Sequence, residues 1–249
     1  MTLPKNFAVL TRPRIEPKDM DLGKEFKLDI LMKFPGAWKA IDAKWLETPG
    51  RLKDGGLTLV SEDEDYAHYR VWFDYFRKGI AAKEYRLEKA EFEIWQHKNG
   101  LSLVVNAPRE LAELSATFLS VVRCRDPFAI RLHKLNKEDF ITLIQYVRSL
   151  GGKVTVLQLR YVRTEDMGEL SSLKVSGKDM EEQNIEKLLS AARKVTRIGF
   201  YIPNLGGEVF KFWVGHWGGG TIYMPLTLEP HHIWRLIDFF ENSFCNELL

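Results

Sequence analysis

Residues 210–230 read FKFWVGHWGGGTIYMPLTLEP. Phe210 and Phe212 alternate with Lys211 and Trp213, the period of a half-buried strand, and a second β-rich run begins after three glycines. A glycine turn between two such runs predicts a β-hairpin. Pro230 then suits the first turn of a helix, where its missing N–H costs nothing. The stretch therefore predicts two antiparallel strands followed by a helix.

The same order occurs earlier, at 92–108, as FEIWQHKNGLSLVVNAP. Its turn contains Asn99-Gly100, a strong hairpin signal because a type I′ turn needs positive φ at both central residues. The helix that follows matches the later one at an offset of 122 residues, with Pro108, Leu111, Leu114 and Phe118 in the places of Pro230, Ile233, Leu236 and Phe240. The hairpin-and-helix block is thus present twice.

A second pair of blocks extends this similarity towards the N-terminus. The alternating runs at 26–34 and 128–135 predict strands, and an offset of 102 residues relates them. The same offset carries Trp38, Ile41 and Trp45 onto Phe140, Leu143 and Val147, whose spacing is that of one helix face. Gly-Gly pairs then lead into β-rich runs at 57–60 and 153–162.

We therefore expect an α+β protein made of two tandem copies of one unit, related by a pseudo-twofold axis. Each copy would run strand, helix, strand, a variable middle, antiparallel strands and a closing helix, giving mainly antiparallel sheets covered by helices. The expected division is an extended N-terminal arm at 1–23 with basic and proline residues, a first unit at 24–122, and a second unit at 126–249. Strand–helix–strand patterns also recur by chance in α+β proteins.

The middle segments of the two copies differ. Residues 180–195 predict an amphipathic helix with Ile185, Leu188, Leu189 and Ala192 on one face. Residues 65–76 fit either a strand or a helix, and their aromatic and β-branched content favours a strand.

Gly218-Gly219-Gly220 does not form a phosphate-binding motif. A phosphate-binding loop needs a Lys and a Ser or Thr directly after the glycines, and a dinucleotide fingerprint needs a helix there. Here Thr221 begins a strand. The hairpin tip still carries His216 and Trp217, which could stack on a base or a partner, or fold back onto the sheet.

Basic and aromatic residues interleave along several predicted strands, in the hairpin turns and in the N-terminal arm. Alternate strand residues share a face, and sheets with aromatic, Arg and Lys side chains hold single-stranded nucleic acids in several modules. The candidate binding residues are Lys211, Trp213, His216, Trp217, Arg160, Arg163, Arg70, Trp72, His97, Lys98, Arg12 and Arg14. The alternative is that the aromatics belong to the core and the charges to the solvated face.

Catalytic and metal signatures are weak, so we expect no catalytic residues, cofactor or metal site. His231 and His232 are adjacent, not i and i+4 as in a zinc-binding helix, and no third ligand is evident. His68, His97 and His133 read as solvent-facing strand residues. The acidic run at 62–65 reads as a solvated turn, and Cys124 as an ordinary residue between the copies.

The composition is that of a globular chain, with 36 basic and 34 acidic residues and a net charge of +2. Any nucleic acid must therefore be held by a local patch. We expect no membrane segment and no secretory signal, hence a cytoplasmic protein, and the scarcity of Gln suggests a thermophile. The favoured function is non-catalytic binding of RNA, a ribonucleoprotein such as the ribosome, or DNA. A protein–protein interaction or homodimer is the alternative, and an enzyme with a site between the repeats is the third possibility.

Overall fold

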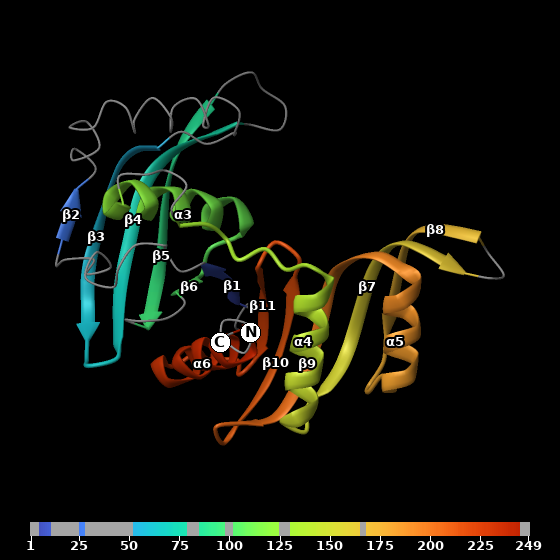
Figure 1. Ribbon diagram of the computed structural model, residues 1–249. Helices are drawn as coiled ribbons and strands as arrows, with labels where there is room; N and C mark the ends of the chain where they lie inside the picture. Colours follow the sequence, from blue (N-terminus) through green and yellow to red (C-terminus); the bar gives the residue numbers. More distant parts are fainter. Residues whose placement is uncertain are drawn as a thin grey trace. The chain divides into compact units, whose positions relative to one another are not determined.

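The computed structural model describes residues 5–10, 25–27, 52–78, 85–97, 102–124, 130–164 and 168–244. The chain divides into two compact units (Figure 1). The N-terminal unit is Phe7–Leu132, and the C-terminal unit is His133–Leu249 together with Met1–Asn6. Each unit combines antiparallel strands with helices, which confirms the mixed α and β class expected from the sequence.

In its described residues, the N-terminal unit contains an antiparallel sheet in the order β2-β3-β4-β5-β6-β1, and the helix α3 follows the sheet in the chain. Its elements are β1 (Lys5–Leu10), of which Phe7–Leu10 belong to this unit, β2 (Glu25–Lys27), β3 (Leu52–Glu62), β4 (Tyr66–Lys78), β5 (Tyr85–His97), β6 (Ser102–Val105) and α3 (Arg109–Cys124). The segment at 65–76 is therefore a strand, as its composition favoured.

The core of this unit follows from alternation along β4 and β5. Tyr69, Val71 and Phe73 are buried on one face of β4, and Phe92 and Ile94 are buried on the paired strand. The rings of Phe73 and Phe92 meet edge to face, with centroids 5.4 Å apart. Period-two burial of aromatic and β-branched side chains explains why the segment is a strand.

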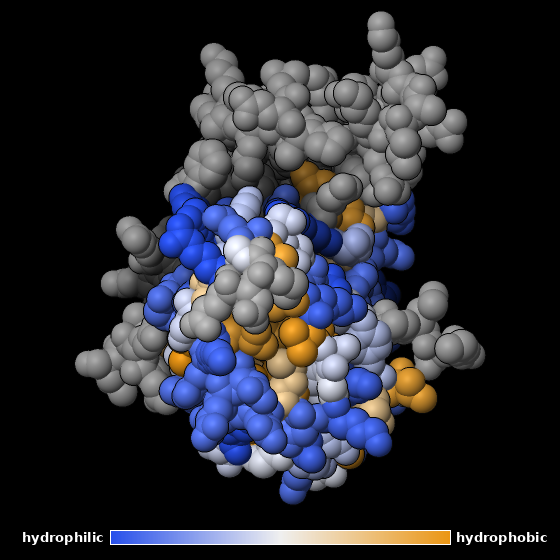
Figure 2. All heavy atoms as spheres, turned by 90° about the vertical axis from the view of Figure 1, so that its right-hand side faces the viewer, coloured by the Kyte–Doolittle hydropathy of each residue, from blue (hydrophilic) through white to orange (hydrophobic). Residues whose placement is uncertain are grey.

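The C-terminal unit contains an antiparallel sheet in the order β11-β10-β9-β7-β8. Its elements are α4 (Lys137–Ser149), β7 (Lys153–Thr164), β8 (Gly168–Ser176), α5 (Glu182–Ala191), β9 (Ala192–Leu205), β10 (Glu208–Gly215), β11 (Gly219–Met224) and α6 (Pro230–Phe244). Figure 2 views the molecule from the side of β8 and α5, where hydrophilic side chains cover much of the described surface.

Helices α4 and α6 cover one face of this sheet. Phe212 on β10 meets Phe239 of α6 edge to face at 5.6 Å, and it also lies 5.7 Å from Phe200 on β9. Tyr146 of α4 contacts the same Phe239, with ring centroids 5.3 Å apart. The three phenylalanines are at most 1% exposed, so burial of apolar surface holds the helices on the sheet.

Two elements expected in the second half of the chain are wrong in detail. Residues 130–135 form no strand and make one isolated bridge, between Leu10 and Leu132, before Asn136 caps α4. The helix expected over 180–195 ends at Ala191. Ala192 and Val195 instead pair with Val162 and Leu159 on β7, because the β-branched run that follows draws this segment into the sheet.

Several other expectations lie outside the described residues. These are the strand at 28–34, the helix at 38–45, Lys98 in its turn, and Arg12 and Arg14 in the N-terminal arm. In the part of the chain that the structure does describe, no helix has the length and apolar character needed to cross a bilayer.

Candidate functional site

The glycine-rich stretch forms the turn of the β10–β11 hairpin, as expected. The Gly218 N–H donates to the Gly215 carbonyl at 2.9 Å, and Gly218 has φ +83°. A Cβ at Gly218 would lie 2.0 Å from the carbonyl oxygen of His133. Glycine is therefore required here both by the left-handed backbone and by the close passage of another segment.

The two side chains of the turn lie against the hairpin and its neighbouring strand, and His216 Nδ1 is 3.4 Å from the Thr196 carbonyl oxygen. The His216 N–H donates to the Thr196 carbonyl at 3.1 Å, and the His216 carbonyl accepts from Leu135 N–H at 2.9 Å. Trp217 lies against Gly215, where an added Cβ would be 2.8 Å from the indole Nε1. Of the two alternatives for Trp217, folding back onto the sheet is the one observed.

The sheet face opposite α4 and α6, hereafter the open face, carries aromatic and basic side chains. Residues paired directly across antiparallel strands share a face. The register pairs Lys211 with Tyr201, Trp213 with Gly199, and Arg160 with Lys194. By this register and the alternation along each strand, the open face includes Gln158, Arg160, Ser172, Lys174, Lys194, Arg197, Gly199, Tyr201, Lys211, Trp213, Thr221 and Tyr223.

Trp213 is the centre of this surface. The Arg197 guanidinium lies over its ring, 3.8 Å from the centroid, and the indole Nε1 donates to the Tyr223 hydroxyl at 3.1 Å. Tyr223 is 42% exposed. The cation–π contact and the hydrogen bond fix the orientation of the indole before any ligand arrives.

The open face is positively charged. Besides Lys153, which is paired with Tyr201 and lies 3.6 Å from the Asp179 carboxylate, the cations on it are Arg160, Lys174, Lys194, Arg197 and Lys211, and the strand positions given above include no Asp or Glu. The near-neutral chain thus has a local basic patch beside the exposed ring of Tyr223 and the half-buried rings of Trp213 and Tyr201, a combination typical of surfaces that contact nucleic-acid backbones and bases.

The candidate residues of the N-terminal unit stand among acidic neighbours. Arg70 pairs across the strands with Glu93, and Trp72 pairs with Glu91. Lys89 lies 5.2 Å from the Trp72 ring. The charges on this face are therefore mixed, which reduces attraction for phosphate.

Two further candidates lie at the ends of strands. His97 contacts Tyr66, with ring centroids 5.2 Å apart. Arg163 faces Glu169 across β7 and β8. His97 belongs to the N-terminal unit, whereas Arg160 and Lys211 lie on the same sheet face as Trp213 in the C-terminal unit.

Sequence reasoning missed Arg197, Tyr201 and Tyr223. The signal for the first two was present, because Arg197, Gly199 and Tyr201 alternate with the apolar residues Ile198, Phe200 and Ile202. Extending the preceding helix to 195 hid the start of this strand.

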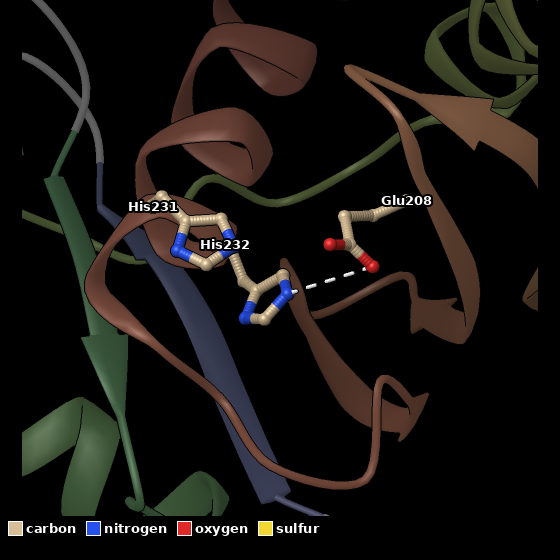
Figure 3. Close-up of side chains that lie close together, drawn as sticks. All are labelled: Glu208, His231 and His232. Atoms are coloured by element: carbon tan, nitrogen blue, oxygen red, sulfur yellow. Dashed lines mark ion pairs between the residues drawn. The ribbon is translucent and has the colours of Figure 1, made fainter.

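Three side chains at one end of the C-terminal unit form a separate polar cluster. One ligand atom from each of Glu208, His231 and His232 lies within 4.8 Å of the others (Figure 3). His232 Nε2 is 3.9 Å from the Glu208 carboxylate, and the two imidazole centroids are 3.9 Å apart. No third group near the two histidines was evident from the sequence, and the structure brings one beside them. Glu208, at the start of β10, supplies that group, and its distance in sequence concealed it.

His232 also caps its helix. The Glu229 N–H donates to His232 Nδ1 at 2.8 Å, at the position where Gln or Glu reaches back in a capping box. Desolvation by burial lowers the pKa of His232, and the neighbouring His231 lowers it further, while Glu208 acts in the opposite direction. Burial and the neighbouring His231 thus favour the neutral form of the ring.

Two other histidines differ from expectation. His68 is 8% exposed and stacks on Trp95 with centroids 3.6 Å apart, so it is not on a solvated face. His133 is half-buried against Phe244, and burial lowers its pKa. By contrast, Asp63 behaves as a turn residue, accepting the N–H groups of Asp65 and Tyr66.

The sequence matches no protein-family model, and no curated protein is significantly similar to it. The geometry of the open face and of the His–Glu cluster therefore carries the functional conclusions.

Proposed function

We propose that the protein binds single-stranded RNA, in free form or within a ribonucleoprotein, on the open face of the C-terminal unit. The observation that carries the proposal is the Trp213 group, in which an oriented indole, an exposed phenol and a guanidinium lie together on a basic sheet face. In this proposal the protein binds without catalysing a reaction and is located in the cytoplasm.

The aromatic rings supply sequence-tolerant contacts. Unpaired bases stack on aromatic side chains, and each such contact contributes about 1–3 kcal/mol as measured by alanine substitution. Tyr223 is exposed, and Trp213 is half-buried beneath Arg197. A base approaching Trp213 would meet a guanidinium plane that itself stacks on bases. Bases inside a duplex are not available for such stacking, so the surface favours single strands.

The five cations of the open face other than Lys153, which lies beside Asp179, would contact the phosphates. The affinity for single strands falls with salt by about 0.7 log units per log unit of salt for each phosphate contact. Engagement of all five side chains therefore gives a slope of about −3.5. Loss of one contact would reduce the slope by about 0.7 and weaken binding similarly for different sequences.

The test is a tryptophan-quenching titration with a mixed-sequence RNA oligonucleotide at about 50 mM and about 200 mM salt. Single-stranded DNA and duplex DNA serve as comparison ligands. We expect quenching by the single strands that weakens steeply with salt. Trp213→Ala should reduce RNA affinity about 5- to 150-fold, equivalent to about 1–3 kcal/mol. Lys211→Ala should flatten the salt dependence.

Matched controls come from outside the open face. Lys187 is an exposed cation on α5, and Trp72 is a half-buried indole of the N-terminal unit. Lys187→Ala and Trp72→Ala should bind RNA as the wild type does. No salt-sensitive binding, or equal losses in the test and control variants, would overturn the proposal. A concentration-dependent dimer without RNA binding would favour the protein-interaction alternative.

We also propose that the two units are duplicated copies. The sheet of the N-terminal unit contains four adjacent strands in the order β3, β4, β5 and β6, which precede α3 in the chain. The sheet of the C-terminal unit contains four adjacent strands in the order β7, β9, β10 and β11, which precede α6. The strand β8 and helix α5 would then be an insertion between the second copy's first two strands. The matched blocks at 92–95 and 210–213 occupy corresponding strands, β5 and β10, which supports the proposal. Superposition of separately determined structures of the two units tests it, and different strand paths would exclude it.

A further inference from the structure

We propose that Glu208, His231 and His232 bind a divalent transition-metal ion of the zinc type, independently of any nucleic acid. Two imidazoles and one carboxylate are a donor set that binds zinc with three protein ligands and leaves a position for water. The three ligand atoms already lie within 4.8 Å of one another. Around a tetrahedral zinc, with bonds of about 2.0–2.2 Å, ligand atoms are about 3.3 Å apart, so a modest contraction completes the site.

The fold positions the three ligands from two elements of the same unit. His231 and His232 are the second and third residues of α6, after Pro230, and Glu208 is the first residue of β10. His232 is buried, His231 is exposed, and the Glu208 side chain is 44% exposed. The cluster thus has one fixed ligand, two that can adjust, and access for solvent.

The charges around the cluster include some that favour a bound cation and some that oppose it. The positive end of the α6 dipole and the nearby Arg235 oppose a cation, whereas the Glu208 carboxylate and Glu229 favour one. These opposing contributions predict moderate affinity rather than that of a closed structural zinc site.

Metal binding and helix capping compete for His232. Because Nδ1 accepts the Glu229 N–H, the neutral ring carries its hydrogen on Nε2, the nitrogen that faces Glu208. A metal ion at Nε2 displaces that hydrogen to Nδ1, and the capping hydrogen bond is then lost. Zinc should therefore accelerate hydrogen exchange at the Glu229 amide while it orders the side chains of Glu208 and His231.

The affinity test uses the full-length protein without a histidine tag, stripped of metal with a chelator. Zinc binding is measured by competition with a chromophoric chelator, and Co²⁺ is used as a spectroscopic probe of coordination. We expect one zinc ion per chain and visible Co²⁺ bands that zinc abolishes. Glu208→Gln and His231→Gln should each weaken zinc binding about tenfold or more, since even residues that only support ligands contribute about 10–100-fold.

Two variants separate the metal site from folding and from incidental histidine binding. Glutamine at position 232 can still accept the N-cap N–H, as in a capping box, so His232→Gln should keep the fold and lose the metal. His97→Gln removes a histidine of the N-terminal unit and should bind zinc as the wild type does. Absence of zinc binding by the wild type would overturn the proposal. So would equal affinities in the wild type, Glu208→Gln and His231→Gln.

Discussion

Replacing Gly218 with alanine should disrupt the β10–β11 hairpin. The new Cβ would stand 2.0 Å from the His133 carbonyl oxygen, well inside contact distance, and that oxygen belongs to backbone that cannot simply rotate away. The left-handed φ of +83° adds a second cost. Movement of the 133–135 segment would also strain the hydrogen bond from Leu135 N–H to the His216 carbonyl.

The cost of Gly218→Ala follows from these three effects. A left-handed alanine costs about 1–2 kcal/mol, overpacking about 1–3 kcal/mol, and the hydrogen bond about 1 kcal/mol. The expected loss in the free energy of unfolding is therefore about 3–6 kcal/mol. Gly151 is the matched control, because it has φ +69° and an added Cβ there meets nothing within 4 Å. Gly151→Ala should cost only the backbone contribution of about 1–2 kcal/mol.

Urea unfolding, followed by tryptophan fluorescence and circular dichroism, measures both variants. Trp213 and Trp217 lie in the affected unit, so the fluorescence transition of Gly218→Ala should move to lower urea concentration. If the two variants differ by less than about 0.5 kcal/mol, the size of an ordinary surface effect, the close approach to His133 does not constrain the turn. A normal fluorescence midpoint with an altered circular dichroism spectrum would contradict the reasoning as well.

Three further predictions concern stability. The pKa of His232 is lowered in the folded state. As the pH falls below about 6.5, the folded protein therefore binds fewer protons than the unfolded chain. The free energy of unfolding should reach its highest contribution from His232 above that pH and decrease below it. Urea midpoints between about pH 8 and pH 5 measure this decrease, and His232→Gln should make it shallower; an unchanged slope would contradict the assignment. Ser120→Ala should lower the free energy of unfolding by about 1–3 kcal/mol, because the buried Ser120 Oγ accepts the Ile130 N–H at 2.7 Å. An equilibrium unfolding midpoint equal to that of the wild type would show that this hydrogen bond does not stabilise the fold. Phe212→Ala should cost about 3–5 kcal/mol by calorimetry or urea unfolding, since its ring packs between Phe200 and Phe239; a loss below about 1 kcal/mol would show that the core relaxes around the cavity.

Much of the fold was predictable because buried and exposed positions alternate along the strands where apolar and polar residues alternate in the sequence. The segment 66–78 is a strand because buried residues recur every second position at Tyr69, Val71 and Phe73, a period that the sequence shows. The errors arose where tertiary contacts, rather than the local sequence, determine the secondary structure. Residues 130–135 alternate like a strand, yet the backbone there makes a single bridge and turns into the Asn136 cap. Ala192 has good helix propensity, but its pairing with Val162 places it in β9.

The site was less predictable than the fold. Lys211 and Trp213 could be placed on one face from their spacing, but the partners of Trp213 come from other strands. Neither Arg197 nor Tyr223 is a sequence neighbour of Trp213, and only the register brings them together. Glu208 shows the same limit, since no motif links it to two histidines more than twenty residues later.

The C-terminal unit is built from segments that are far apart in the chain. It includes Met1–Asn6, and Thr221 Oγ1 donates to Asn6 Oδ1 at 2.8 Å across a sequence separation of 215 residues. During synthesis the first segment must therefore wait until β11 has emerged, whereas the N-terminal unit consists of residues up to Leu132. Closing so long a loop costs entropy before its contacts form, so this unit should be completed late and slowly. The N-terminal unit should therefore fold first during synthesis, because the C-terminal unit combines residues from the start of the chain with residues after position 132.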